Sequence, residues 1–123
     1  MATESLRSRA AAPIDLPALL SRCIGKTNLR RRVLESFLSQ SSVDLELLAA
    51  AIGKSDDSEI ARLAHRLRGT SLSVSATGFA AIAYELEEVA ETASLDEVLR
   101  LTVELQNEHH RIVDFVRSTE NAV

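Results

Sequence analysis

The chain has 123 residues, of which 46% are hydrophobic and 26% are charged, and its formal net charge is −4. A chain of this length can bury one hydrophobic core and is expected to form a single domain. Its single cysteine excludes a disulfide framework and a cysteine-based zinc site. An aromatic content of 3%, without Trp, argues against stacking of single-stranded nucleic acid, and the acidic balance argues against binding a phosphate backbone.

The N-terminal segment is not expected to be a signal peptide. Residues 1–9 mix charged and polar side chains and lack the apolar stretch of a signal peptide. No apolar run in the chain reaches the roughly 20 residues needed to cross a bilayer. We therefore expect a cytoplasmic protein without a membrane segment. Residues 1–14 show no apolar periodicity and are expected to form a flexible tail, followed by a single helical domain over 15–123.

The composition favours helices, because Ala and Leu are abundant while Gly and Pro are scarce. Asp15 is a good N-cap residue, and Pro17 is tolerated in the first turn of the short helix that would follow. Gly25 is placed to end this helix. Cys23 is most simply a small buried apolar residue of the same helix.

A long helix is predicted over residues 28–52. Ser41 and Ser42 are weak helix formers and leave open whether this segment is one helix or two. Asp56, with Glu59 three residues later, resembles a capping box and opens a third helix. The apolar face of the long helix comprises Leu29, Val33, Phe37, Leu48 and Ala51. The stripe of the third helix comprises Ile60, Leu63, Leu67 and Val74.

Two further helices complete the pattern. The third helix is expected to end near residues 73–75, and a fourth to run over 77–93. Ser94 and Glu97 form a capping box that opens the last helix. The fourth helix would bury Phe79, Ile82, Ala83, Leu86 and Ala90, and the last Val98, Leu101, Leu105, Ile112 and Val116. Short connections between helices with one apolar stripe each predict an all-α, antiparallel up-down four-helix bundle, preceded by the short extra helix.

His65 is the residue whose side chain and position suit a chemical role. On a helical wheel it lies almost opposite the apolar stripe of the third helix and should be exposed. Gly69, one turn later, costs the helix about 1 kcal/mol relative to Ala, and its missing side chain would let another surface approach closely. Ala61, one turn earlier, is also small. Leu72 continues this strip with an exposed apolar group, which suits docking.

Three arginines flank His65 in the sequence. Positive charge from Arg62, Arg66 and Arg68 is expected to disfavour the imidazolium form and to keep the ring neutral and nucleophilic. The same guanidinium groups could then hold an arriving anionic group. This combination suits phosphoryl transfer between proteins. The alternative interpretation is a histidine on an ordinary charged surface.

Residues 64–76 read Ala-His-Arg-Leu-Arg-Gly-Thr-Ser-Leu-Ser-Val-Ser-Ala. This stretch resembles the signature of histidine-containing phosphotransfer (HPt) domains, approximately Ala-His-x-Leu-Lys-Gly-Ser-Ser-x-x-Ile/Leu-Gly-Ala. The resemblance covers roughly residues 28–120, nearly the whole predicted helical domain. Outside the motif it extends to Phe37, Asp56, Phe79, Ile82 and the Leu86-Glu87 pair.

The resemblance implies a four-helix bundle in which His65 accepts a phosphoryl group from one receiver domain and passes it to another. Arg68 would supply a charge near the phosphoryl group, at a position where the family usually has Lys. Gly69 would let the receiver approach. Glu87, on the adjacent helix, occupies a position from which a polar side chain can face the histidine. The receiver-docking surface would comprise Ala61, Arg62, Gly69 and Leu72.

The implied partners are receiver domains of hybrid sensor kinases and response regulators. The chain is expected to act as a monomeric phosphocarrier, without a cofactor or bound metal, because the receiver would supply the Mg²⁺ ion. Two departures from the family pattern stand out. Arg68 keeps the charge of Lys but changes its geometry. Ser75 replaces a Gly, so the turn would differ if that Gly has positive φ in relatives.

Other candidate sites are weaker. His109 and His110 point about 100° apart on a helix and cannot easily share a metal ion, and His109 is expected in or near the core. Glu85, Glu88 and Glu91 are expected on a solvated face. The three consecutive arginines at 30–32 point in different directions and make a poor nucleic-acid patch.

Two functions are alternatives to phosphotransfer. A histidine kinase dimerisation helix would have Glu after the histidine and Pro downstream, whereas Arg66 follows His65 and no Pro occurs after Pro17. No Gly-rich nucleotide loop is present either, so the chain is not expected to phosphorylate itself from ATP. The remaining alternative is a non-catalytic helical adaptor that uses the same face only to bind receiver domains or other signalling proteins.

Overall fold

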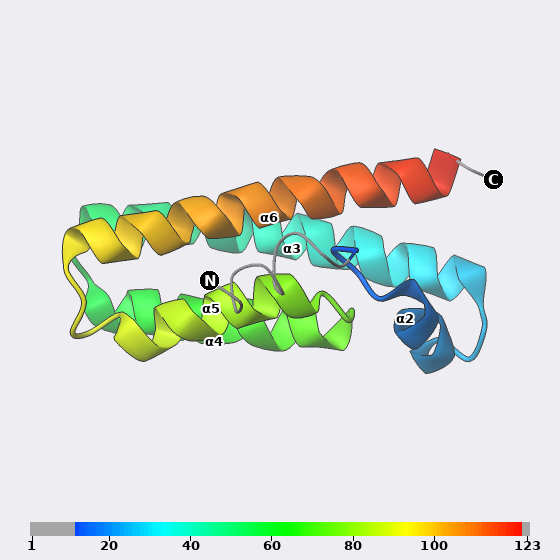
Figure 1. The fold of residues 1–123 in the computed structure, drawn as a ribbon, viewed down its shortest axis with the longest axis horizontal. Coiled ribbons are helices and arrows are strands. Elements are labelled where there is room, and N and C mark those ends of the chain that lie inside the picture. Colours follow the sequence, from blue (N-terminus) through cyan, green and yellow to red (C-terminus); the bar gives the residue numbers. More distant parts are fainter. Residues whose placement is uncertain (1–11, 122–123) are drawn as a thin grey trace.

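The computed structural model describes residues 12–121, and the ordered elements of this range are helices (Figure 1). No strand occurs between residues 12 and 121, so the predicted all-α class is confirmed. Within the same range no helix is both long and apolar enough to cross a membrane. The helices are α2 (Leu16–Arg22), α3 (Thr27–Gly53), α4 (Asp57–Ser73), α5 (Thr77–Val89) and α6 (Leu95–Asn121).

The four longer helices run antiparallel to their neighbours in chain order (Figure 1). α4 packs against both α3 and α5, and α6 packs against α5 and, over a smaller contact, against α3. The short helix α2 lies beside the N-terminal part of α3. This arrangement buries one side of α4 between two helices and leaves its opposite side open, with α5 as an immediate neighbour.

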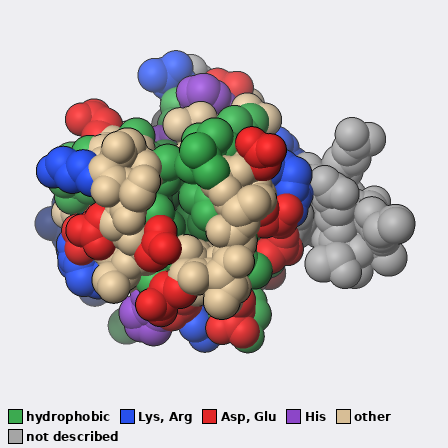
Figure 2. Space-filling view, turned by 90° about the vertical axis from the view of Figure 1, so that its left-hand side faces the viewer, with side chains coloured by type: hydrophobic (Ala, Val, Ile, Leu, Met, Phe, Trp, Pro, Cys, Tyr) green, Lys and Arg blue, Asp and Glu red, His purple; other side chains and the backbone are tan. Residues whose placement is uncertain are grey.

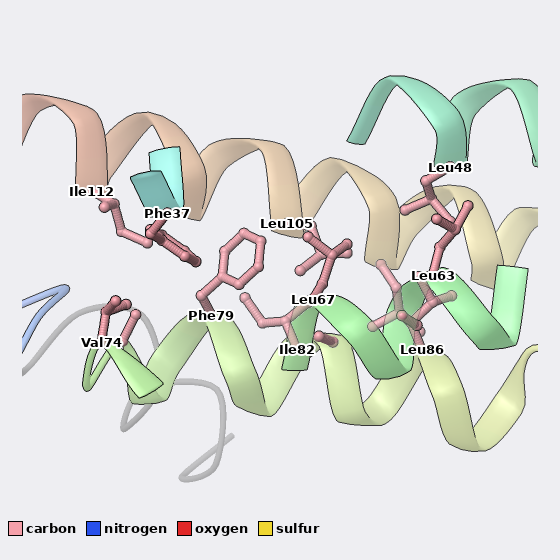
Figure 3. Close-up of a cluster of buried hydrophobic side chains, with 14 of the residues drawn as sticks. Phe37, Leu48, Leu63, Leu67, Val74, Phe79, Ile82, Leu86, Leu105 and Ile112 are labelled. Carbon is pink, nitrogen blue, oxygen red and sulfur yellow. The ribbon is translucent and has the colours of Figure 1, made fainter. Parts of the chain in front are cut away.

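The predicted apolar stripes of α4, α5 and α6 are buried, and that of α3 is buried in part. Phe37 on α3 and Phe79 on α5 meet edge to face, with ring centroids 6.1 Å apart and planes at 87° (Figure 3). This geometry is favourable for aromatic rings beyond the area they bury. Leu29 and Val33 are only partly buried, because α3 extends beyond the end of α4. The core also contains Leu48, Leu63, Leu67, Val74, Ile82, Leu86, Leu101, Leu105, Ile112 and Val116.

One end of the molecule is formed by the α3–α4 and α5–α6 connections (Figure 2). Hydrophobic side chains are visible near its centre, and acidic and basic side chains surround them. A small hollow at this end is lined by Ile52, Ser55, Asp57, Ile60, Ala93, Leu95 and Val98. Charges of both signs are interspersed around it, so this end presents no single-sign field that would attract a polyanion.

The fourth predicted helix is shorter than expected, because α5 ends at Val89 instead of Ala93. The amide of Thr92 donates to the carbonyl of Val89 at 3.1 Å and closes a turn after the helix. The predicted cap that follows is present, since Oγ of Ser94 accepts the amide of Glu97 at 3.2 Å. The chain has to reverse direction before this cap, which ends α5 one turn early.

The N-terminal boundary of the packed unit also differs from the prediction. Ile14, assigned to a flexible tail over 1–14, is 1% exposed and belongs to the core. The amide of Asp15 donates to the carbonyl of Ser75 at 3.0 Å and ties this segment to the end of α4. The prediction is therefore wrong at Ile14. The part of the predicted tail over 1–11 lies outside the described residues.

Ser75 has φ +61° and so adopts the left-handed conformation without being a glycine. The turn that closes α4 requires it, since the amides of Ser75 and Ala76 donate back to the carbonyls of Leu72 and Ser71 at 3.1 and 2.9 Å. The turn is therefore formed with a serine where the family pattern has Gly. Its cost is the steric strain of a Cβ atom in this conformation.

Ser75→Gly is expected to raise the free energy of unfolding by about 0.5–1 kcal/mol, because it removes that strain at some cost in chain entropy. Urea denaturation measures the change. Ser73→Gly, inside the last turn of α4, is the matched control and should destabilise the protein, since Gly is unfavourable within a helix. Destabilisation by Ser75→Gly would contradict the argument.

The pair of serines at positions 41 and 42 does not interrupt α3, which is one continuous helix. The Ser41 hydroxyl donates to the carbonyl of Leu38 at 3.2 Å, and its oxygen lies 2.8 Å from Nε2 of His109 on α6. The hydroxyl and the ring nitrogen therefore share a buried hydrogen bond that joins α3 to α6. His109 is 8% exposed, which confirms its predicted place at the core.

Burial, with a contribution from the adjacent His110, lowers the pKa of His109 below the ordinary value of 6.5. The folded protein therefore resists protonation where the unfolded chain accepts it. The contribution of His109 to the free energy of unfolding is fully present above pH 6.5. It is lost as the pH falls through that value towards the lowered pKa of the folded state. Over this pH range the free energy of unfolding of the wild type should fall by up to about 1.4 kcal/mol per pH unit relative to that of His109→Leu.

Urea denaturation of both proteins between about pH 7.5 and about pH 5.5 tests this expectation. Glu108, whose pKa is raised by burial, titrates in both proteins and cancels in the comparison. Parallel stability profiles for the two proteins would show that His109 does not couple folding to pH.

Candidate functional site

His65 stands on the open side of α4 with its side chain 68% exposed, as the helical wheel predicts. Its Nδ1 atom lies 2.8 Å from Oε2 of Glu87 on α5. A carboxylate only accepts hydrogen bonds, so Nδ1–H is the donor in this contact. The neutral ring then carries its lone pair on Nε2, the nitrogen that Glu87 does not contact. The contact thus leaves Nε2 as the ring nitrogen with an available lone pair.

A second pair of residues adjoins this contact. Arg68 lies three residues after His65 on α4, and Tyr84 lies three residues before Glu87 on α5. Because the helices are antiparallel, these steps run in the same direction in space, about 4.5 Å along the helix axes. Nη1 of Arg68 is 3.4 Å from Oε1 of Glu87, and its Cζ lies 4.9 Å from the centroid of the Tyr84 ring.

The arginines that flank His65 in the sequence do not form the positively charged surrounding that the sequence suggested. Arg62 pairs with Glu59 of its own helix, at 2.8 and 2.6 Å. Hydrogen bonding in this pair lowers the pKa of Glu59 and raises that of Arg62. Arg68 shares the carboxylate of Glu87 with His65. Each positive charge therefore has a negative partner nearby.

Arg66 is directed away from the histidine and towards α3. Its guanidinium makes two contacts with Asp44, at 2.6 and 3.2 Å, and Asp44 also accepts from Gln40 at 3.1 Å. Asp44 is fully buried, whereas the side chain of Arg66 is 38% exposed. This pair joins α4 to α3. The expectation that Arg66 acts on the imidazole is replaced by a structural role.

The small residues of the predicted docking strip place no large side chain beside His65 one turn before or after it. Gly69 is exposed, and a Cβ atom added there would meet no atom of the protein within 4 Å. The fold itself therefore does not require a glycine at this position. Ala61 is half-buried and Leu72 is 43% exposed, while Arg62 is exposed at the edge of the strip.

A shallow groove between α4 and α5 continues this strip. Tyr84 is 46% exposed and forms part of the groove wall together with Leu72. Sequence reasoning missed both the groove and Tyr84. The available signal was the spacing of Tyr84 and Glu87, which places the two side chains on one face of their helix. The lining residues are Arg68, Leu72, Thr77, Ala80, Ala81 and Tyr84.

The other candidates of the sequence lie apart from this site. His110 is exposed on α6, and Cys23 is buried. Glu85 forms an ion pair with Arg100 of α6 at 3.6 Å, and Glu88 and Glu91 are exposed. Across residues 12–121, no group of three or more His, Cys, Asp or Glu side chains is arranged to hold a metal ion.

Comparison with known proteins assigns the class. The model of the Hpt domain family matches residues 32–115, more than half of the chain. The chain therefore belongs to the Hpt domain family, whose members are phosphocarriers that interact with receiver domains in two-component phosphorelays. The resemblance of residues 64–76 to the HPt signature is confirmed.

Among solved structures, the fold is similar to the crystal structure of histidine-containing phosphotransfer protein B (HptB) from Pseudomonas aeruginosa PAO1. The TM-score is 0.83 at 23% sequence identity, over 93% of this chain and 99% of that chain. This likeness establishes a shared helical fold. No curated protein sequence matches the chain significantly.

Proposed function

We propose that this protein is a phosphorelay intermediate in which Nε2 of His65 accepts a phosphoryl group from the aspartyl phosphate of one receiver domain and passes it to another. The observation that carries the proposal is the exposed imidazole whose Nδ1–H is held by Glu87, in a chain of the Hpt family. In this proposal the four longer helices form an up-down four-helix bundle. The protein is a monomer in the cytoplasm.

The proposed reaction needs no proton to leave the ring. The Nε2 lone pair of His65 attacks phosphorus, the bond to the receiver's aspartyl oxygen breaks, and the carboxylate departs with the electron pair. The phosphorylated ring keeps its Nδ1 proton and is cationic, so the carboxylate of Glu87 stabilises the charge that develops. In the onward step a second receiver's carboxylate attacks phosphorus, and Nε2 regains its lone pair.

Arg68 supplies positive charge beside the reacting ring in this proposal. Its guanidinium contacts Glu87, the same side chain that contacts the imidazole of His65. Charge neutralisation and positioning dominate phosphoryl transfer, because the transferred group carries negative charge on its oxygens. The divalent ion is held by the receiver domain, and the chain uses neither a cofactor of its own nor ATP.

The receiver docks, in this proposal, on the strip of Ala61, Arg62, Gly69 and Leu72 around His65. The strip combines a low surface at its centre with an exposed leucine at one end. Exposed apolar groups rimmed by polar ones favour association with another protein. The groove between α4 and α5 extends the contact area towards Tyr84.

A transfer assay tests the proposal. A receiver domain carrying labelled aspartyl phosphate is mixed with the protein, and the label is expected to appear on the protein in an acid-labile, base-stable form. That stability pattern distinguishes phosphohistidine from a phosphoester. Binding of several cognate receivers without any transfer of label would instead support a non-catalytic adaptor.

Gly69→Leu is expected to slow transfer from a receiver at least about tenfold, because a leucine side chain would stand between the two proteins at the centre of the contact. The variant should be about 0.5–1 kcal/mol more stable than the wild type, since Leu is the better helix former and meets no atom within 4 Å at its Cβ. Transfer kinetics and urea denaturation measure the two effects. Equal transfer rates in the two proteins would contradict close docking at this position.

A further inference from the structure

Four side chains form a rectangle across the α4–α5 interface. His65 faces Glu87, and one step along both helices Arg68 faces Tyr84. Each oxygen of the Glu87 carboxylate contacts a different residue. Oε2 is 2.8 Å from Nδ1 of His65, and Oε1 is 3.4 Å from Nη1 of Arg68. The contact with Arg68 is long for a charged hydrogen bond, whereas a guanidinium that pairs freely with a carboxylate closes to about 2.7–2.9 Å and engages both oxygens.

Arg68 has a second neighbour, the ring of Tyr84. The guanidinium carbon lies 4.9 Å from the ring centroid, within the range of a cation–π interaction. Arg68 thus has two attractive neighbours, the aromatic ring of Tyr84 and the carboxylate of Glu87. Tyr84 is 46% exposed and Arg68 37%, so both side chains are accessible and their interaction is of the surface kind.

We propose that Tyr84 is a positioning residue for His65, which acts by holding Arg68 so that Glu87 keeps one oxygen for Nδ1 of the imidazole. Without the aromatic ring, Arg68 would pair with both oxygens of Glu87, and the imidazole would lose the acceptor that keeps its proton on Nδ1. The proton would then also occupy Nε2, and the lone pair needed for attack would be less available.

This inference deepens the proposed function and rests on it for its kinetic consequence, but its effect on the imidazole does not require a phosphoryl group. Tyr84 also lines the groove between α4 and α5, so a contact with a docked receiver is the competing explanation for any effect of its loss. The test therefore uses a donor that needs no docking surface. Phosphoramidate is suitable, since its P–N bond breaks, ammonia leaves and a bond from phosphorus to Nε2 forms.

The first measurement is the rate of phosphorylation of His65 by phosphoramidate. Tyr84→Leu keeps an apolar side chain in the groove but removes the ring, and should slow the reaction about two- to fivefold, the range of an exposed cation–π interaction. Tyr84→Phe keeps the ring and should match the wild type. Leu99→Ala, at an exposed apolar side chain of α6, controls for a general loss of apolar surface.

The effect of Tyr84→Leu is also measured in a protein that carries Arg68→Gln, which tests whether Tyr84 acts through Arg68. If Tyr84 acts through Arg68, adding Tyr84→Leu to Arg68→Gln should produce no further change in the phosphoramidate rate. If the two substitutions instead have independent, multiplying effects, the inference is wrong. A deficit of Tyr84→Leu that appears only with a receiver as donor would likewise overturn it in favour of a docking contact.

The second measurement is the position of the ring proton of His65, read from ¹H–¹⁵N correlations of the imidazole in the neutral state. The wild type is expected to carry this proton on Nδ1, and Tyr84→Leu should shift the population towards Nε2–H, whereas Tyr84→Phe should not. If this shift is seen and yet the wild type accepts no phosphoryl group on His65, the relay function fails and the positioning role stands. An unchanged ring in Tyr84→Leu refutes the positioning role and leaves the relay function intact.

Discussion

His65→Gln is expected to abolish phosphoryl acceptance while leaving the fold intact. An amide nitrogen offers no free lone pair for attack on phosphorus, because its electrons are delocalised towards the carbonyl group. The side chain at this position is 68% exposed, so its replacement removes little packing. A glutamine can still hydrogen-bond to Glu87 and preserves the polarity of the site. The label from a phosphorylated receiver should therefore fall to background.

The chain offers a matched control for this experiment. Of its three histidines, His110 is also exposed but lies on α6, away from the α4–α5 interface. His110→Gln should accept label at the wild-type rate, and both variants should keep the wild-type urea midpoint. Acid-labile label that persists in His65→Gln would remove His65 from the role proposed for it.

Arg66→Met is expected to destabilise the protein by about 3 kcal/mol without impairing the chemistry of His65. The guanidinium of Arg66 makes two hydrogen bonds to Asp44, whose side chain is fully buried between α3 and α4. Removing it leaves a buried carboxylate with Gln40 as its remaining hydrogen-bond partner. The methionine retains the length of the arginine stem, so most of the loss reflects the uncompensated charge.

Urea denaturation measures this effect, and two further variants sharpen it. Arg62→Met removes an exposed arginine whose partner Glu59 is half-buried on the same helix, and should leave stability unchanged within error. Combining Arg66→Met with Asp44→Leu should recover much of the loss, because the double variant has no unpaired charge. Equal effects of Arg62→Met and Arg66→Met would show that the buried pair is not a distinct stabilising feature.

The helices and the exposure of His65 could be predicted because they depend on local spacing. Capping at Asp56 and Ser94 and the 3.6-residue repeat of apolar side chains act within a few residues of chain. The exposure of His65 follows from the buried stripe of its own helix. Where neighbouring segments compete, as at the end of α5, the same reasoning placed the boundary a turn too late.

The ion pairs around the site could not be predicted in the same way, because they depend on which helices are neighbours and on the register between them. Arg66 precedes Arg68 by two residues, and yet one turns to Asp44 on α3 and the other to Glu87 on α5. Sequence proximity suggested that both charges act on the imidazole, whereas helical rotation separates them by about 200°.

The amino-acid sequence by itself determined an all-helical chain, an exposed histidine with small residues one turn to either side, and membership of a family by the motif around it. Only the tertiary structure decided which nitrogen of His65 contacts Glu87 and which arginine shares that carboxylate. The physical reason is that hydrogen bonds and cation–π contacts between helices require distances within a few tenths of an ångström. Such distances arise from the packing of α4 on α5, which periodicity along one helix does not encode.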